Sequence, residues 1–283
     1  MRTSDIANWE LRASPKHGVS EAVWAKYQTQ QDVRPGDVLL VHEGTYLIGT
    51  SAPVTRYDLP LLFQHHLAKL RPAPDAPLTG PLLAALLSAP IVQRQIRSKQ
   101  FTADIIDSIV GRLQEVVLPI PRDEQARAAL AKRCADVYEE RAEIRSRLSL
   151  LVHRLDDSLR SADPTPVRRV LTDELGEGSP MALLGERIGF RAFQHGHDAV
   201  LGDVLIPAYY DPTIRQALDD LAAGGCELVS VRELAHAGVI SLETGDEVGK
   251  LAYGSGDVPF VRTSDLGTWE LKLDPKQRVS GSA

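Results

Sequence analysis

The chain has 283 residues, of which 43% are hydrophobic and 25% charged, and its formal net charge at pH 7 is −6. This composition is typical of a folded globular protein, and no run of about 20 apolar residues, the length that a membrane span needs, occurs in it. The N-terminus has no apolar signal segment, so we expect a cytoplasmic protein with no membrane partner. The two cysteines, Cys134 and Cys226, encode neither a disulfide framework nor a zinc site.

The negative charge lies in the last part of the chain. Residues 163–283 hold 11 Lys and Arg against 19 Asp and Glu, whereas residues 1–162 are close to neutral. Affinity for duplex DNA comes largely from Lys and Arg that neutralise phosphates, so the net charge argues against a simple DNA binder. The neutral part still permits local basic loops, and a partner would supply much of the phosphate contact.

The two ends of the chain repeat each other. Residues 2–20 and 262–280 are identical at eleven of nineteen aligned positions, and the match includes Trp9 with Trp269 and Pro15 with Pro275. We interpret the ends as copies of one structural piece. The first copy runs on into a long downstream segment, whereas the second is preceded by short apolar runs, so each copy lacks what the other has. We expect both tryptophans to anchor a core, with stacking on DNA as the alternative.

Short apolar runs separated by Gly, Pro and Asp follow the first copy. Val38–Val41, Tyr46–Gly49, Leu61–Phe63 and Leu67 predict strands, with tight turns at 35–37 and 43–45. Residues 82–88, 89–98 and 103–113 predict helices, and residues 116–121 predict a short strand closed by prolines. Together these elements predict a mixed α+β domain over residues 1–121.

The clearest helix in the sequence begins near Asp123 and continues without Gly or Pro to about Ala162. At 1.5 Å per residue such a helix is about 60 Å long, which suits a spacer or a pairing helix. Burial in a helical bundle is the alternative. The apolar residues recur at alternating spacings of four and three, interrupted by Arg141, as in the seam of a coiled coil. The seam residues are Leu130, Cys134, Val137, Ile144, Leu148, Leu151 and Leu155.

Residues 163–225 predict a connector that contains an amphipathic helix from Pro212 to Ala223. Phosphate-binding glycine loops, the nucleophile elbow and the Asn/Asp-Pro-Pro-Tyr segment of amino-methyltransferases are all missing from the sequence. His195 and His197 lack a third ligand at a helical interval, so no metal and no cofactor are expected. We therefore expect a protein that is not an enzyme.

Several polar positions are candidates for contact with DNA. Arg-Thr-Ser-Asp at each end suits either turn capping or hydrogen bonds to phosphates, and Arg97 to Gln100 predict a basic loop able to read base edges. His65 and His66 should point to opposite faces of a continuing strand. Solvated loops and strand ends are the alternative reading. The candidate residues are Arg2, Thr3, Ser4, Lys16, Tyr46, Gln64, His65, Arg97, Ser98, Lys99, Gln100, Arg262, Thr263 and Ser264.

The order of these parts carries a resemblance to a known family. Gly36–Val41, Gly44–Gly49 and Leu118–Pro121, followed by Glu124-Gln125 at the head of the long helix, resemble a specificity subunit of Type I restriction-modification systems. The resemblance implies an α+β fold, with a target-recognition domain of short twisted strands and helices joined to a long coiled-coil spacer helix. It also implies double-stranded DNA and an adenine methyltransferase subunit as partners, with a restriction or translocase subunit as a further partner in phage defence.

The chain departs from the family's layout of two recognition domains and two helices. We expect residues 1–121 to form the main part of one recognition domain, residues 122–162 the spacer and dimerisation helix, and residues 163–225 a connector. Residues 226–283 would complete the domain, either within one chain as a circular permutation or between two chains by exchange. A homodimer paired through the long helix would then recreate two domains and read a symmetric, split target. The alternatives are a truncated product, a coiled-coil adaptor without DNA binding, and a degenerate nuclease.

Overall fold

The computed structural model describes residues 1–12, 18–44, 47–100, 107–161, 163, 165–173, 211–245, 248–266, 271–273, 275 and 277–281. The described residues within 1–149 and 249–283 form one compact unit, and those within 150–248 form a second. Both helices and strands are present, so the predicted α+β class is confirmed at that level. Among the described residues, no helix combines the length and apolar character needed to cross a membrane.

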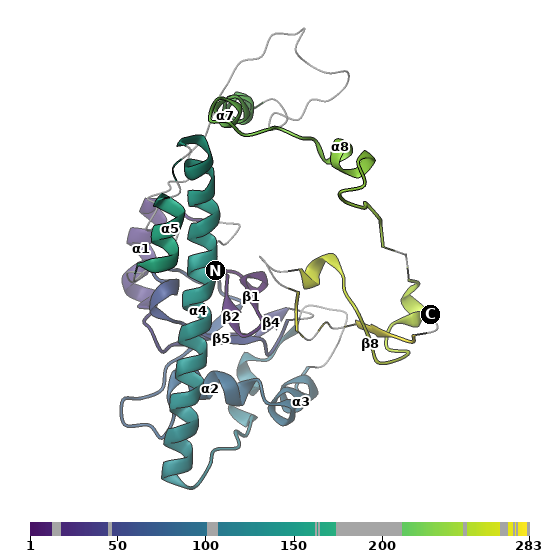
Figure 1. Ribbon diagram of the computed structural model, residues 1–283. Helices are drawn as coiled ribbons and strands as arrows, with labels where there is room; N and C mark the ends of the chain where they lie inside the picture. Colours follow the sequence, from purple (N-terminus) through teal and green to yellow (C-terminus); the bar gives the residue numbers. More distant parts are fainter. Residues whose placement is uncertain are drawn as a thin grey trace. The chain divides into compact units, whose positions relative to one another are not determined.

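A three-stranded antiparallel sheet lies at the centre of the first unit (Figure 1). The middle strand, β3 (Val38–Val41), pairs with β5 (Ser51–Pro53) on one side and with β6 (Leu67–Leu70) on the other. Leu39 is opposite Ala52 and Lys69 in the two registers. All four side chains of β3 are buried, which is why the sequence there is a continuous apolar run rather than an alternating one.

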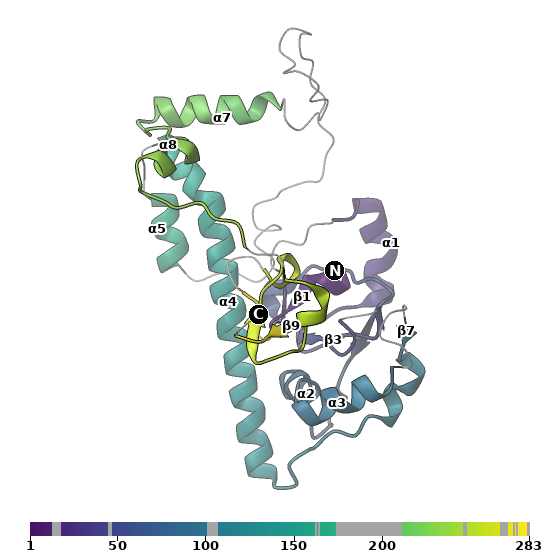
Figure 2. The same cartoon turned by 90° about the vertical axis from the view of Figure 1, so that its right-hand side faces the viewer.

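The two faces of β3 are covered by different parts of the chain (Figure 2). Leu39 and Val41 pack with Ile6 and Leu11 of the hairpin formed by β1 (Ile6–Ala7) and β2 (Glu10–Leu11). Val38 packs on the other face with α2 (Gly80–Leu87) and α3 (Pro90–Ser98). Successive side chains of a strand point to opposite faces, which explains this division. The helices predicted at 82–88 and 89–98 are confirmed as α2 and α3.

Smaller elements complete the domain. Helix α1 (Glu21–Gln31) precedes the sheet, and the short strands β4 (Glu43–Gly44) and β7 (Asp107–Ser108) pair antiparallel beside it. The 3-10 helices are η1 (Thr3–Asp5), η2 (Arg56–Asp58) and η3 (Val110–Glu115). The turn predicted at 35–37 is confirmed, because Gly36 adopts a φ of 90° between α1 and β3.

Several predicted elements were wrong. Residues 48 and 49 form a turn rather than a strand, since Gly49 has a φ of 90° that a strand does not adopt. Residues 61–63 and 116–121 have no strand partner. Leu61, Phe63, Val116 and Leu118 pack on the cores, whereas Val117 and Ile120 are exposed. Glu43 and Gly44 pair with Ser108 and Asp107, which replaces a predicted turn and part of the predicted helix over 103–113. Thr45, Tyr46 and residues 103–106 lie outside the described residues.

The long helix is confirmed as α4 (Glu124–Ser161), a single helix of 38 residues (Figure 1). The Asp123 carboxylate accepts a hydrogen bond from the Ala126 amide at 2.6 Å, which satisfies one of the unpaired donors at the helix N-terminus. Ala142 and Ser146, four residues apart, are buried on one side of the helix. The pairing of α4 with another helix remains a prediction.

Ion pairs hold residues 139–145 of α4 against the first 60 residues of the chain. Arg145 contacts the Asp58 carboxylate at 2.7 Å and Glu10 at 3.6 Å, and Arg141 contacts Glu10 at 2.6 Å. Arg56 contacts Glu139 at 2.5 Å. Asp58 is buried at 2% side-chain exposure, so removal of Arg145 would leave a buried charge at a cost on the order of 3 kcal/mol. These contacts hold the domain at one place along the helix.

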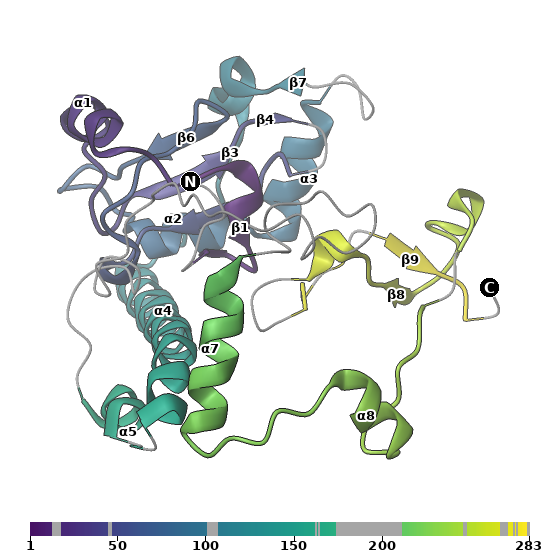
Figure 3. The ribbon, with the colours of Figure 1, turned by 90° about the horizontal axis from the view of Figure 1, so that it is seen from above.

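The terminal repeat has the same local structure twice. In each copy a 3-10 turn follows an extended arginine, at η1 and at η7 (Thr263–Asp265), and the aspartate carboxylate accepts the arginine amide hydrogen bond. Residues 6 and 11 then pair in the first copy, as Leu266 and Leu271 pair in the second. The second copy also has β8 (Val258–Phe260) paired with β9 (Gln277–Val279) (Figure 3), following η6 (Lys250–Ala252).

The second unit contains helices. Besides the end of α4 it holds α5 (Thr165–Thr172), α7 (Pro212–Ala223) and α8 (Val231–His236), and the predicted helix 212–223 is confirmed. Arg160 of α4 contacts Asp220 of α7 at 3.3 Å. Gly224, which ends α7, packs against the last turn of α4. An added Cβ at Gly224 would be 2.8 Å from the Arg160 carbonyl oxygen.

The contact of α2 with the turn before β3 generates a stability prediction. A Cβ at Gly80 would lie 1.9 Å from the carbonyl oxygen of Gly36. We expect Gly80→Ala to lower the free energy of unfolding by about 2 kcal/mol, because backbone cannot move aside as a side chain can. Urea denaturation measures this, with Gly111→Ala as the control, since nothing lies within 4 Å of a Cβ there. Equal losses in the two variants would contradict the close contact.

Candidate nucleic-acid interface

The loop that carries Gln64 and His65 is held by the last residue of α1. The Gln31 side-chain amide donates to the Phe63 carbonyl oxygen at 2.8 Å and accepts from the Phe63 amide at 2.9 Å. The Lys69 ammonium group donates to the carbonyl oxygens of Gln31 and Asp32, at 3.1 Å for the latter. These bonds tie α1, the loop 62–66 and β6 together, so a polar segment without regular structure has a defined position.

The N-terminal segment lies against the same loop. The Met1 amino group donates to the Leu62 carbonyl oxygen, and the Gln64 amide donates to the Met1 carbonyl oxygen at 3.0 Å. Burial lowers the pKa of this amino group. The contact places Met1, which directly precedes Arg2, Thr3 and Ser4, against the loop that carries Gln64 and His65. We call residues 2–4 and 64–66 the candidate interface.

The prediction that His65 and His66 point to opposite faces was wrong. The two residues form a turn before β6, and their ring centroids are 3.9 Å apart with the planes tilted by 44°. His65 is exposed, and its carbonyl oxygen is 2.9 Å from Nε2 of the buried His42. His66 lies 3.3 Å from the Glu43 carboxylate. The interface therefore presents an exposed ring on a well-supported turn.

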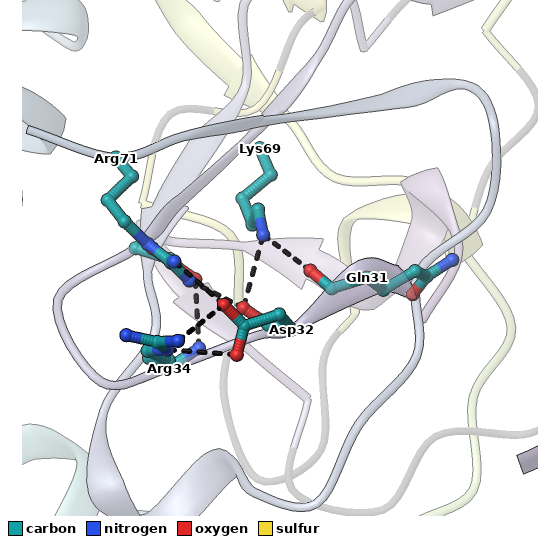
Figure 4. Close-up of polar contacts among 6 residues, drawn as sticks. Gln31, Asp32, Arg34, Lys69 and Arg71 are labelled. Atoms are coloured by element: carbon teal, nitrogen blue, oxygen red, sulfur yellow. Dashed lines mark hydrogen bonds and ion pairs between the residues drawn. The ribbon is translucent and has the colours of Figure 1, made fainter. Parts of the chain in front are cut away.

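Two arginines, one between α1 and β3 and one just after β6, are neutralised within the domain (Figure 4). Arg71 contacts Asp37 at 2.6 Å and Asp32 at 3.0 Å, and Arg34 contacts Asp32 at 2.8 Å. Asp32 follows α1 with a φ of 41°, which directs its carboxylate to both guanidinium groups. Hydrogen bonds from Arg34 and Arg71 lower the pKa of Asp32 to about 2. This charged cluster organises the turn and leaves phosphate contact to other residues.

The predicted basic segment 97–100 lies elsewhere. Arg97 and Ser98 form the last turn of α3 rather than a loop, and the Ser98 hydroxyl donates to the Gln95 carbonyl oxygen at 2.7 Å. The Lys99 ammonium group pairs with Glu115, whereas Arg97 is exposed. Because α3 covers the face of β3 opposite to the β1–β2 hairpin, the structure does not bring residues 97–100 into the candidate interface.

The remaining candidate residues for DNA contact lie either in the second copy of the repeat or outside the described residues. Arg262 and Thr263 belong to the second copy of the repeat, where the Arg262 guanidinium group lies 3.6 Å from the Asp265 carboxylate. That geometry agrees with the turn-capping reading of the Arg-Thr-Ser-Asp segment. Ser264 lies in η7, and its side chain is outside the described part. Lys16 and Tyr46 also lie outside the described residues, as do Trp269, His195 and His197.

Sequence reasoning misplaced Trp9. It was expected to anchor a core, but 38% of the residue is exposed at the tip of the β1–β2 hairpin. Asn8 and Trp9 have φ values of 49° and 64°, as the two central residues of a tight hairpin turn require, and a bulky residue rarely adopts this conformation. A tryptophan held in a strained turn is a candidate for stacking. The short apolar–polar alternation around Asn8 was the signal for the hairpin.

The predicted helix-pairing residues form an open apolar stripe in the single chain. Leu130, Val137, Ile144, Leu148 and Leu155 are each at least 39% exposed, and Cys134 and Leu151 are half-buried. Burial raises the pKa of the Cys134 thiol. Arg141 interrupts the stripe where Glu10 contacts the helix.

The candidate interface carries polar and cationic groups that could contact a polar ligand. Within the described residues, no group of three or more His, Cys, Asp and Glu side chains is placed to hold a metal ion. The side chains of the candidate interface offer hydrogen-bond donors and acceptors, one guanidinium group and aromatic rings. Such groups recognise phosphates and base edges.

The Asp32 cluster generates a pH prediction. A carboxyl whose pKa is lowered on folding contributes stability above its unfolded value of 3.8, and this contribution is lost as the pH falls toward 2. We expect the Asp32 carboxyl carbon to titrate near pH 2 in an NMR experiment. Arg34→Gln should raise that pKa toward 3.8, because Arg34 gives the largest contribution. An unchanged pKa in Arg34→Gln would contradict the assigned cause.

Comparison with known proteins assigns no family: no family model matches the chain, and no curated protein matches it.

Proposed function

We propose that the chain is a sequence-specific DNA recognition subunit that directs an adenine methyltransferase to its target, with a restriction nuclease subunit as a further partner. The sequence resemblance to Type I specificity subunits suggests this function. It would act by binding alone, without a cofactor, and a partner would carry out the chemistry.

The observation that carries the proposal is a small α+β domain fixed by ion pairs to one place on a 38-residue helix. A protein that reads two separated half-sites needs a reading domain and a spacer of constant length. The Arg145–Asp58 and Arg141–Glu10 pairs would transmit the position of the helix to the domain. The candidate interface would then be presented at a fixed distance from the helix axis.

The apolar stripe on α4 supports a homodimer within this proposal. Exposed leucine, isoleucine and valine at heptad spacing favour antiparallel or parallel helix pairing, which removes them from water. Two domains related by a twofold axis would read a symmetric target in two halves. The acidic segment after α4 would remain available for protein partners rather than DNA.

A second candidate is a coiled-coil adaptor of a defence complex that does not bind DNA. The observation in its favour is the charged cluster, in which Arg34 and Arg71 are already paired with Asp32 and Asp37. Arginines that are already paired with the domain's own carboxylates contribute less to the binding of phosphates. DNA affinity separates the two candidates.

Removal of the one guanidinium group in the candidate interface tests the proposal. We expect Arg2→Gln to weaken binding to duplex DNA roughly tenfold at low salt and to reduce the salt slope by about one ion. Arg34→Gln is the matched control, because its charge is already satisfied by Asp32 and the affinity should change little. Fluorescence anisotropy at several salt concentrations measures both. Equal losses in both variants would place the DNA elsewhere, and no binding by the wild type would favour the adaptor.

Charges in the apolar stripe test the pairing. The double substitution Ile144→Asp and Leu148→Asp should raise the dissociation constant of the dimer by about 100-fold or more. This corresponds to a loss on the order of 3 kcal/mol, because charges replace two apolar contacts. Both side chains are exposed in the single chain, so its helicity should persist. Arg133→Asp, an exposed polar position on the same helix, is the control. Sedimentation equilibrium gives the masses, and a dimer that survives the double substitution would exclude the stripe as the interface.

A further inference from the structure

The described residues of the two repeat copies share a 3-10 turn and a pairing of two apolar residues but differ in exposure. In the first copy, Ile6 and Leu11 are 2% and 1% exposed. Their counterparts in the second copy, Leu266 and Leu271, pair in the same way but are 55% and 54% exposed. The second copy is thus folded like a buried element while its apolar face is open to solvent.

The place occupied by the first copy has a defined chemistry, and we call it the seat. Ile6 and Leu11 fill an apolar site formed by Leu39, Val54 and Leu61. Glu10 meets Arg141 at 2.6 Å and Arg145 at 3.6 Å at the edge of this site. The seat selects two branched apolar side chains five residues apart, with a carboxylate beside the second.

The second copy meets these requirements. Leu266 and Leu271 have the same spacing and pairing as Ile6 and Leu11, and the sequence has Glu270 at the position that corresponds to Glu10. In the second copy, Val279 of β9 pairs with Val258 of β8, a strand that precedes the repeat. The counterpart of Val279 in the first copy is Val19, which is 50% exposed. The second copy therefore has the apolar spacing and the acidic residue of the element that the seat holds.

Within one chain the two copies lie side by side and do not compete for the seat. The Asn8 side chain donates to the Leu271 carbonyl oxygen at 3.2 Å and accepts from the Leu273 amide at 3.1 Å. This contact uses the backbone of the second copy and leaves Leu266 and Leu271 exposed. The open apolar face is therefore available to another molecule.

We propose that the second copy of the repeat, residues 262–273, inserts into the seat of a second copy of this chain and displaces residues 2–12 there. The exchange is reciprocal, so it closes a symmetric dimer. It joins two recognition domains through their terminal segments, independently of pairing through α4. The exchange moves residues 2–4 away from Gln64 and brings the identical Arg262-Thr263-Ser264 of the other chain there. Its test contains no DNA.

A photocrosslink from the second copy tests this. A diazirine analogue of leucine is placed at position 271 of the full chain, equal amounts of ¹⁴N and ¹⁵N protein are mixed and irradiated, and the linked peptides are sequenced by mass spectrometry. We expect insertion into peptides that contain Leu39, Val54 or Leu61, in heavy–light pairs as well as same-isotope pairs. Links to these peptides within one chain only, or links to the region of Asn8 only, would overturn the proposal.

Control positions keep the result interpretable. The same analogue at Leu11 should link to the same three peptides and shows that the seat is reactive. At Leu251, which is fully exposed outside the repeat, it should give no such links. Leu266→Ser, combined with the analogue at 271, should reduce heavy–light links by roughly tenfold, because one half-exposed leucine no longer becomes buried. Its melting temperature should match that of the unsubstituted chain, and an unchanged yield would exclude the seat.

Discussion

The burial of β3 on both faces is the constraint on which the rest of the first unit depends. Val38–Val41 is a single short strand, yet it separates two apolar cores that contain the β1–β2 hairpin on one face and α2 with α3 on the other. Substitution of either alternating set would open one core and leave the other in place, at about 2–5 kcal/mol for each large side chain reduced to alanine. The candidate interface belongs to the first of these layers, because residues 2–4 directly precede the hairpin that covers Leu39 and Val41.

Ion pairs position the elements that the two apolar cores do not hold, namely α4 and the turn between α1 and β3. Arg145 and Arg141 connect the hairpin and η2 to α4, while Arg71 and Arg34 fix the turn between α1 and β3. Asp58 and Asp37 are buried carboxylates, so each pair is specific for its partner, and loss of one member is costly. These arginines therefore stabilise the protein's own architecture. The proposed DNA contact rests on a small number of groups at one edge and on the cations of a partner.

The sequence was informative where one physical signal dominated. The apolar run 38–41, the paired helices before Lys99 and the long helix 124–161 were predicted because continuous burial, proline starts and uninterrupted periodicity leave few alternatives. Residues 61–63 and 116–121 were mispredicted because their apolar residues, some packed on the cores and some exposed, have no strand to pair with. The contact between Met1 and Gln64 and the exposure of Trp9 depend on tertiary packing and on an unusual turn, and neither leaves a local pattern.

The repeat was visible in the sequence, but its consequence was not. Identity at eleven of nineteen positions predicted two copies of one piece, and only their exposures distinguish a copy in its seat from one that is open. The central claim, sequence-specific DNA recognition, is tested most directly by selection of duplexes from a random library with the full chain at low salt. The account predicts enrichment of a symmetric motif in two halves separated by a constant spacing. Recovered duplexes with no enriched sequence, from a chain that remains folded, would contradict it.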